Sequence, residues 1–416
     1  MVRRTAAQLT ALAVLLLALA LVAGAAPARA ADAPPQLTAE SAILIEASTG
    51  EVLYERAAEK ARPIASTTKL MTALLTMEHA KLSDMVTASS YVASPIESKL
   101  SLRAGERLSV ADLLRGLMLE SANDAAVTLA EHVSGSRTAF VRLMNRRARE
   151  LKLEHTHFAN PIGLDEPGNY ASAHDLARLA IELRKHSFVR KVADRTSATL
   201  STGDRPRSIR NRNTLLERDR RINGLKTGHT AGAGYVLVGT RTSDHVTLVS
   251  VVLGTPSLAA RDQDSLALLA WGQTKYERIH PVTQGTVVDK PEIEFRRGAT
   301  VNLVTGGSVT RAVRTGAKIT YNDVGVPDMV TGPVARGQQF GYREVFADGK
   351  RIAAVPIVSQ LFVPGADLTQ RTKDWFTRPI SLLLAVAVLG ATVLVGRRLR
   401  RGPPRRRPPR TEPEAA

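Results

Sequence analysis

A serine and a lysine three positions apart stand near the start of a predicted helix, in the stretch Ser66-Thr67-Thr68-Lys69. Residues at this spacing share a helix face, so the lysine amine can reach the serine hydroxyl. A hydroxyl becomes a strong nucleophile when a base takes its proton, and a lysine is such a base when burial or nearby positive charge lowers its pKa. The neighbouring Leu70 and Met71 favour burial. The backbone N–H of Ser66, at a helix start, can also donate to a carbonyl oxygen under attack.

Two further groups of polar residues could take part in catalysis or in substrate binding. Ser121-Ala122-Asn123 separates two apolar-periodic segments, which predicts an inter-helix turn that can face a cleft. Lys226-Thr227-Gly228-His229-Thr230 precedes a strand hairpin, so a cation and a hydroxyl can lie along one accessible sheet edge and bind a carboxylate. Taken singly, each group has an ordinary explanation as a helix cap or a surface turn. Their presence together favours a catalytic interpretation.

The segments around these groups alternate between strand and helix patterns. Ala42–Glu46 and Glu51–Tyr54 flank a Ser-Thr-Gly turn and predict a hairpin. A helix is expected after Pro63, and two more fit 110–119 and 124–132. A second hairpin is predicted from 235–240 and 246–252, and its continuous apolar runs are typical of central strands.

After Gly272 the helical periodicity ends, and short strand-like pieces such as Thr300–Val304 and Ile352–Ile357 alternate with glycine turns. We therefore expect an α+β fold in which a catalytic domain over residues 36–274 is followed by a small all-β domain over residues 280–366. The plainest role for the second domain is that of a spacer between the first domain and a membrane.

Both termini carry targeting patterns. Residues 1–30 combine Arg3 and Arg4, an apolar run and Ala28-Arg29-Ala30, which predicts a secretory signal peptide cleaved after Ala30. Residues 379–396 are uncharged and precede a cluster of arginines, so they predict a transmembrane helix rather than a buried core helix. Residues 397–416 form a basic Pro/Arg-rich tail that is expected to stay in the cytoplasm, next to anionic lipid.

Composition excludes several function classes. The chain has no cysteine, so disulfides and thiolate zinc sites are ruled out. The net charge is +18, but the chain is expected to be exported and only 4% of its residues are aromatic. A nucleic-acid partner is therefore not expected. The histidines of 155–157 and His174 lack the HExxH spacing and are interpreted as polar surface. Gly232-Ala233-Gly234 is too short for a nucleotide-binding loop, and we expect neither metal nor cofactor.

The order and spacing of the three groups that begin at Ser66, Ser121 and Lys226 resemble the signature of the serine penicillin-binding proteins and serine β-lactamases. Within that superfamily, 209–213 and 224–230 resemble the low-molecular-mass D-alanyl-D-alanine carboxypeptidases of the peptidase S11 family. The resemblance extends from about Ser41 to Trp271 and includes 63–69 and 161–165. It implies a β-lactamase/transpeptidase-like catalytic domain, in which helices flank an antiparallel sheet.

The resemblance also implies roles for individual residues. Ser66 resembles the nucleophile that becomes acylated, and Lys69 its general base. Ser121 resembles a proton relay, and Asn123 a residue that holds the substrate. The remaining positions resemble substrate-binding residues, of which His229 would give the second oxyanion N–H and Arg261 would help to hold a carboxylate: Lys226, Thr227, Gly228, His229 and Arg261.

The reaction that the resemblance implies is removal of the terminal D-alanine from peptidoglycan stem pentapeptides through an acyl-enzyme on Ser66, with covalent binding of β-lactam antibiotics. A β-lactamase is disfavoured because the region around Glu150–Glu154 lacks the asparagine of the Glu-x-x-Leu-Asn segment that class A enzymes use for deacylation. A D,D-endopeptidase acting on crosslinked peptidoglycan would use the same residues. A non-catalytic envelope-binding protein is the alternative from another class, and the intact motifs argue against it.

Overall fold

The computed structural model describes residues 33–377 and 379–400. The predicted signal peptide and the end of the predicted tail, residues 401–416, lie outside the described residues. The chain divides into two compact units between Arg278 and Ile279, and the segment Ala312–Thr315 belongs to the first unit.

A five-stranded antiparallel sheet forms the centre of the first unit, in the order β2-β1-β9-β8-β7. Both predicted hairpins are present, as β1–β2 and as β8–β9, and β7 forms one edge of the sheet. The strands are β1 (Ser41–Glu46), β2 (Val52–Arg56), β7 (Ile222–Thr230), β8 (Gly234–Ser243) and β9 (Val246–Thr255).

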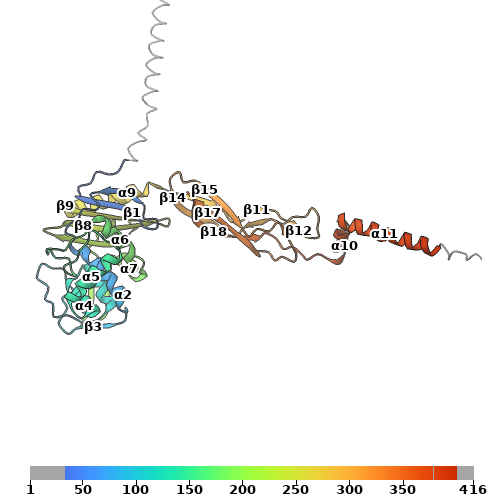
Figure 1. Ribbon diagram of the computed structural model, residues 1–416. Helices are drawn as coiled ribbons and strands as arrows, with labels where there is room; N and C mark the ends of the chain where they lie inside the picture. The colour runs from blue at the N-terminus through green and yellow to red at the C-terminus, as the bar shows by residue number, and fades with distance from the viewer. Residues whose placement is uncertain (1–32, 378, 401–416) are drawn as a thin grey trace, which may run out of the picture. The chain divides into compact units, whose positions relative to one another are not determined.

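Both faces of this sheet are covered by helices, which explains why its central strands are apolar at nearly every position. Alternate side chains of a strand point to opposite faces. In β9, Val249 and Val251 belong to the larger core beneath helices α2, α4, α5 and α6, whereas Leu248 and Val252 belong to the core beneath α9. Figure 1 shows α9 on one side of the sheet and these helices on the other.

The helices and short strands of the first unit connect around this sheet. The η1 turn and helix α2 come directly after the first hairpin and lead the chain into the larger core. The elements are η1 (Ala65–Thr68), α2 (Lys69–His79), β3 (Met85–Thr87), β4 (Arg107–Ser109), α3 (Val110–Arg115), η2 (Gly116–Glu120), α4 (Asn123–Ser134), α5 (Arg137–Glu150), α6 (Ala173–Leu183), α7 (Ser187–Ala193), β5 (Ser197–Leu200), β6 (Arg207–Arg210), α8 (Leu215–Arg218) and α9 (Leu258–Gln273).

One predicted helix differs from the structure in its last turn. The expected helix over 110–119 is α-helical only as far as Arg115, after which η2 continues as a π-helical turn. The wider turn ends at Ser121, which adopts the left-handed conformation with φ of 64°. Single π turns are frequent at functional sites, and here the turn redirects the chain immediately before Asn123.

The second unit is built around a five-stranded sheet in the order β11-β13-β18-β17-β15. Two small clusters of buried side chains, one around Leu303 and Ile357 and one around Val345 and Val355, form its cores. The elements from the end of the first unit onward are β10 (Tyr276–Val282), β11 (Val287–Asp289), β12 (Glu292–Ile293), β13 (Leu303–Thr305), β14 (Val309–Arg314), β15 (Ile319–Val324), β16 (Met329–Val330), β17 (Gln339–Ala347), β18 (Lys350–Ser359), α10 (Leu368–Thr377) and α11 (Pro379–Arg400).

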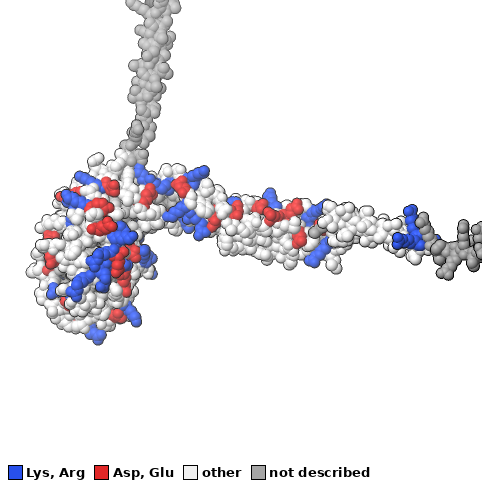
Figure 2. All heavy atoms as spheres, viewed as in Figure 1, with Lys and Arg blue, Asp and Glu red and all other residues white. Residues whose placement is uncertain are grey.

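Helix α11 has the length and composition of a membrane-spanning helix, and within the described residues it is the one helix that does. Its large apolar side chains are exposed, which separates it from a core helix. Figure 2 shows the helix without charged side chains until Lys/Arg atoms appear at its C-terminal end, where Arg397, Arg398 and Arg400 lie. This helix supports an association of the protein with a membrane.

Candidate active site

Ser66 and Lys69 meet at the junction of η1 and α2. The Lys69 Nζ atom donates a hydrogen bond to Ser66 Oγ at 3.0 Å and another to the backbone oxygen of Ile162. Ser66 lies in the tight η1 turn, three residues before Lys69, which is the first residue of α2, so the two side chains lie on the same side of the turn. The contact between Ser66 and Lys69 that the spacing predicted is therefore present in the structure.

Lys69 is fully buried although it carries an amine. Burial and, second, the positive charge of Lys226 lower its pKa well below 10.5, whereas the carboxylates of Glu97 and Asp124 partly oppose the shift. The pKa of Lys69 is thus lowered by the two causes that a lysine base requires.

Two glycines allow the backbone to approach Ser66 closely. A Cβ at Gly228 of β7 would lie 2.8 Å from the backbone nitrogen of Ser66, and a Cβ at Gly163 would lie 2.0 Å from the backbone oxygen of Ala65. Gly163 also has φ of +85°, which favours glycine. The edge strand and the 161–165 loop can therefore contact the nucleophile from two sides only because these positions lack side chains.

The Ser121-Ala122-Asn123 group follows η2 and ends on the first residue of α4, and both Ser121 and Asn123 are buried. The backbone nitrogen of Asn123 donates to the backbone oxygen of Ser98 at 2.8 Å. Its side-chain Nδ2 donates to the Glu97 carboxylate at 2.5 Å. The Asn123 amide is thus held in one orientation by the loop that carries Glu97.

Lys226 and Thr227 lie on β7, and only 1% of Lys226 is exposed. Its Nζ donates to the backbone oxygen of Thr227 at 3.0 Å. Burial, followed by the positive charges of Arg212 and Arg261, lowers the pKa of Lys226 to about 7. Lys226 on the edge strand is thus influenced by two arginines from other elements, and this positive charge is suited to bind an anionic group.

The two arginines near Lys226 differ in their surroundings. Arg261, at the start of α9, is buried, and its guanidinium donates twice to Asp262 Oδ1, at 2.7 and 2.9 Å. Arg212 has a half-exposed side chain and is paired with Glu120. The resemblance over 209–213 implies no role for Arg212, but its exposure makes it the more accessible of the two arginines for a ligand.

A cleft of about 630 Å³ brings residues from all three motifs together, because Ser66, Asn123 and His229 line it jointly. The exposed imidazole of His229 stacks on Tyr235, with ring centroids 3.9 Å apart. Sequence reasoning missed Glu97, which lines the same cleft and belongs to no motif. It also assigned no role to Asp165, although Asp165 stands in the quoted 161–165 stretch.

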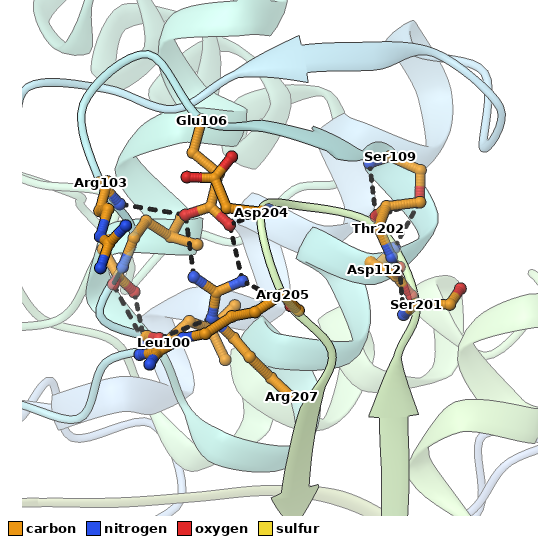
Figure 3. Close-up of polar contacts among 12 residues, drawn as sticks. Leu100, Arg103, Glu106, Ser109, Asp112, Ser201, Thr202, Asp204, Arg205 and Arg207 are labelled. Atoms are coloured by element: carbon orange, nitrogen blue, oxygen red, sulfur yellow. Dashed lines mark hydrogen bonds and ion pairs between the residues drawn. The ribbon is translucent and has the colours of Figure 1, made fainter.

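The segment between β3 and β4, which carries Glu97, is held by a buried ion pair between Glu106 and Arg207, shown in Figure 3. The Arg207 guanidinium donates to both oxygens of Glu106, at 2.7 and 2.8 Å, and to the backbone oxygen of Leu100 at 3.1 Å. Backbone N–H groups of Arg103 and Asp204 also donate to the Glu106 carboxylate. Burial acts to raise the pKa of Glu106, but these bonds outweigh it and lower the pKa to about 2.

Replacing Glu106 with glutamine is expected to destabilise the fold by about 3–5 kcal/mol, because it leaves the buried charge of Arg207 without a counterion. The double variant Glu106→Gln/Arg207→Met, which removes both charges, should recover most of that loss. Urea unfolding of the three proteins at pH 7 measures the difference. A single variant as stable as the wild type would show that the pair does not hold this loop.

His155 and His174 both contact one carboxylate. The Nδ1 atoms of His155 and His174 lie 3.0 and 2.9 Å from the oxygens of Glu59. The buried Asp175 accepts from the backbone nitrogen of His155 at 2.8 Å. The interpretation of these histidines as polar surface residues stays a prediction.

An antiparallel sheet between helices, with a serine on a helix start bonded to a buried lysine and a Lys-Thr-Gly edge strand beside it, is the arrangement of the penicillin-recognising serine enzymes. The family model described as D-alanyl-D-alanine carboxypeptidase, peptidase S11, matches residues 28–257. The chain therefore belongs to the peptidase S11 family, and the predicted family and fold class are confirmed.

Individual relatives agree with the family match over most of the chain. D-alanyl-D-alanine carboxypeptidase DacF of Bacillus subtilis is 32% identical over 77% of this chain and 85% of its own length. DacC of Escherichia coli is 34% identical over 78% of this chain and 84% of its own length. The solved structure of penicillin binding protein 5 from Haemophilus influenzae is 31% identical, with a TM-score of 0.56, and covers 80% of this chain and 99% of its own.

Proposed function

We propose that this protein is a serine D-alanyl-D-alanine carboxypeptidase that removes the terminal D-alanine from peptidoglycan stem pentapeptides, with Ser66 as the nucleophile. The observation that carries the proposal is the 3.0 Å contact between Ser66 Oγ and the Nζ of Lys69, a fully buried amine whose pKa is lowered. The named function of the relatives supports the same reaction.

In the acylation step, the neutral Lys69 amine takes the proton of the Ser66 hydroxyl as Oγ forms a bond to the carbonyl carbon of the penultimate D-alanine. The C–N bond to the terminal D-alanine then breaks, and the proton passes to the departing amine through the Ser121 hydroxyl. In the deacylation step, Lys69 takes a proton from water, whose oxygen attacks the ester, and the proton returns to Ser66. The products are D-alanine, the shortened peptide and the free enzyme.

Three other groups act on the substrate in this proposal. The backbone N–H groups of Ser66 and His229 stabilise the oxyanion, and the close approach of Gly228 to the Ser66 nitrogen supports this pairing. The Asn123 amide binds the acyl part of the peptide. Lys226 and Thr227, with the positive charges of Arg212 and Arg261, bind the terminal carboxylate.

The test is D-alanine release from a soluble stem pentapeptide and from a crosslinked peptide dimer, measured with the full-length enzyme in detergent. A carboxypeptidase releases D-alanine from the pentapeptide and leaves the crosslink intact. Cleavage of the dimer alone would identify the D,D-endopeptidase alternative. If well-folded enzyme acts on neither substrate and forms no penicillin adduct, the catalytic proposal is wrong.

The value of kcat/KM is expected to fall as the pH rises above about 7, because Lys226 then loses the proton that it needs to bind the substrate carboxylate. At saturating substrate kcat should fall less, since the bound carboxylate keeps Lys226 protonated. In Lys226→Arg the guanidinium stays charged, so the alkaline fall should disappear. Rates of D-alanine release from pH 5 to 10 provide the measurement, and a flat wild-type kcat/KM from pH 7 to 9 would contradict the assignment.

We further infer that helix α11 crosses the plasma membrane once, with the catalytic domain outside and the basic tail in the cytoplasm. The arginines at the C-terminal end of the helix support this direction, since positively charged flanks remain on the cytoplasmic side. The chain has no cysteine, so Ala416→Cys creates a unique thiol. A membrane-impermeant maleimide should label it only after cells are permeabilised; labelling of intact cells would reverse the topology.

A further inference from the structure

Four side chains of the kinds that bind metal ions gather in the first unit, away from the catalytic residues. Glu59 follows β2, His155 follows α5, and His174 and Asp175 lie in the first turn of α6. The described residues that line the cleft beside Ser66 include none of the four. They come from three separate segments that no short motif joins, so a metal site was not predicted here from the sequence.

The Glu59 carboxylate lies at the centre of this group. Its Oε2 lies 3.0 Å from Nδ1 of His155, and its Oε1 lies 2.9 Å from Nδ1 of His174. In a tetrahedral zinc site the ligand atoms lie about 3.3 Å apart, because each is about 2.0–2.1 Å from the metal. The two observed distances are close to that separation. Small rotations of these partly exposed side chains would therefore admit a zinc ion between the carboxylate and the imidazoles.

Asp175 brings a second carboxylate to the same place. The ligand atoms of Glu59, His155 and Asp175 all lie within 4.8 Å of one another. Only 2% of Asp175 is exposed. Its side chain accepts hydrogen bonds from the backbone nitrogen of His155 and from the Thr156 hydroxyl, and both bonds end on Oδ2 at 2.8 Å. The other oxygen, Oδ1, is therefore available to a metal ion.

The charges of this group also favour a bound cation. Two carboxylates at this separation repel each other, and the repulsion is stronger where burial lowers the local dielectric constant. Among the described residues, no lysine or arginine forms an ion pair with Glu59 or Asp175, although the chain has a net charge of +18. A divalent cation would balance both carboxylates and leave the two imidazoles neutral, as metal ligation requires.

The backbone already holds the three segments together. The backbone nitrogen of His174 donates to the oxygen of Ala58 at 3.0 Å. Arg62 and Ala171 exchange two backbone hydrogen bonds, at 3.0 and 3.1 Å. The ligands are therefore close to one another without a metal, so binding would require little ordering of the chain.

We propose that a zinc ion binds to Glu59, His155, His174 and Asp175 and joins the segment between α5 and α6 to the chain after β2. Two imidazoles and two carboxylates suit zinc in tetrahedral coordination, whereas calcium and magnesium take oxygen ligands. The segment that the metal would hold carries Ile162, whose backbone oxygen accepts from Lys69. The site is structural: it stabilises the surroundings of the catalytic lysine and takes no part in the reaction, so the inference does not depend on the proposed function.

The test measures zinc binding by the untagged, full-length protein in detergent, after dialysis against a chelator and then against buffer. Calorimetric titration with Zn²⁺ at pH 7.5 is expected to show one site per chain with a Kd of about 1 μM or below. Zinc at about 100 times the Kd should raise Tm by about 5–10 °C, because the ion binds the folded chain and not the unfolded one. Binding should weaken as the pH is lowered to 5.5, since protons compete with the metal for the imidazoles.

The principal variant is His155→Asn/His174→Asn. The side-chain nitrogen of asparagine can replace Nδ1 as a donor to Glu59, so the hydrogen bonds are retained while two metal ligands are lost. Loss of a single outer-shell partner already costs about 10–100-fold in metal affinity, so the Kd should rise by at least about 100-fold. The control His132→Ala removes an imidazole that lies 4.0 Å from the Asp84 carboxylate, and it should keep wild-type zinc binding.

Far-UV circular dichroism and the Tm without zinc show whether each variant is folded. If the double variant is not, Glu59→Gln takes its place, because it changes one exposed carboxylate and should weaken binding by at least about tenfold. One equivalent of zinc on the wild type and the control, lost in the folded variant, supports the site. Absence of zinc binding to the wild type refutes the proposal, and binding that the folded variant retains places the ion on other residues and overturns the assignment.

Discussion

Replacing Ser66 with alanine is expected to abolish the penicillin adduct and to reduce D-alanine release by at least about 10⁴-fold. The hydroxyl oxygen is the atom that forms the acyl bond in the proposed mechanism, and loss of a nucleophile removes the covalent route altogether. Gel fluorography with a labelled penicillin, together with D-alanine release from a stem pentapeptide, measures both effects.

The matched control for this variant is Ser98→Ala, which removes another hydroxyl from the same cleft. It should retain the adduct because the acyl bond is assigned to Ser66. Ser66→Ala itself should change the free energy of unfolding by less than about 1 kcal/mol, since one hydrogen bond is lost and the Lys69 amine keeps its bond to Ile162. A penicillin adduct on the alanine variant would show that another residue is acylated.

The same assay addresses the β-lactamase alternative. Penicillin forms the acyl-enzyme by the same attack, so the two functions differ in how fast water releases the product. The absence of a Glu-x-x-Leu-Asn pattern around Glu150–Glu154 predicts that release is slow. A wild-type adduct that persists for minutes agrees with a carboxypeptidase, whereas rapid turnover of penicillin would favour a β-lactamase.

The secondary structure could be predicted where one periodicity dominates. The apolar runs of Ala42–Ile45 and of 235–252 predicted strands of the central sheet, because such runs are typical of strands that are buried on both faces. The π turn at Gly116–Glu120 could not be predicted, since its apolar pattern is that of an α-helix. Only its packing and the left-handed Ser121 that follows distinguish it.

In the candidate site, contacts between residues close in the sequence could be predicted, whereas contacts between distant residues could not. Ser66 and Lys69 are neighbours in the sequence, so their contact follows from local helix geometry. Glu97 reaches the cleft through a loop held by Asn123 and Asp124, and no short motif records such long-range contacts. The need for glycine at Gly163 likewise arises only when the 161–165 loop meets η1.

Replacing Lys69 with methionine is expected to reduce D-alanine release by about 10³-fold or more. Methionine is unbranched and apolar and can fill a similar volume, so it removes the general base without removing the buried chain. The wild type and the variant are compared at saturating pentapeptide. The control Lys185→Met, at an exposed lysine paired with Glu182, should retain wild-type rates.

The same variant tests the physical state of the amine through stability. The folded pKa of Lys69 lies well below 10.5, so between the two values the unfolded chain holds a proton that the folded chain lacks. The free energy of unfolding of the wild type therefore rises with pH across this window, by about 1.4 kcal/mol per pH unit for Lys69. The variant lacks this contribution and retains that of Lys226. Its stability relative to the wild type should thus decrease as the pH rises from 8 to 10.

Guanidinium unfolding of both proteins at pH 8, 9 and 10, followed by tryptophan fluorescence, provides this comparison, and Lys185→Met should show no such trend. A stability gap that is independent of pH would mean that Lys69 is protonated in the folded protein. A protonated lysine cannot take the proton of Ser66, so the mechanism would then need another base. A loss of rate in Lys69→Met, together with a stability gap that widens as the pH rises, would connect the buried, neutral amine directly to catalysis.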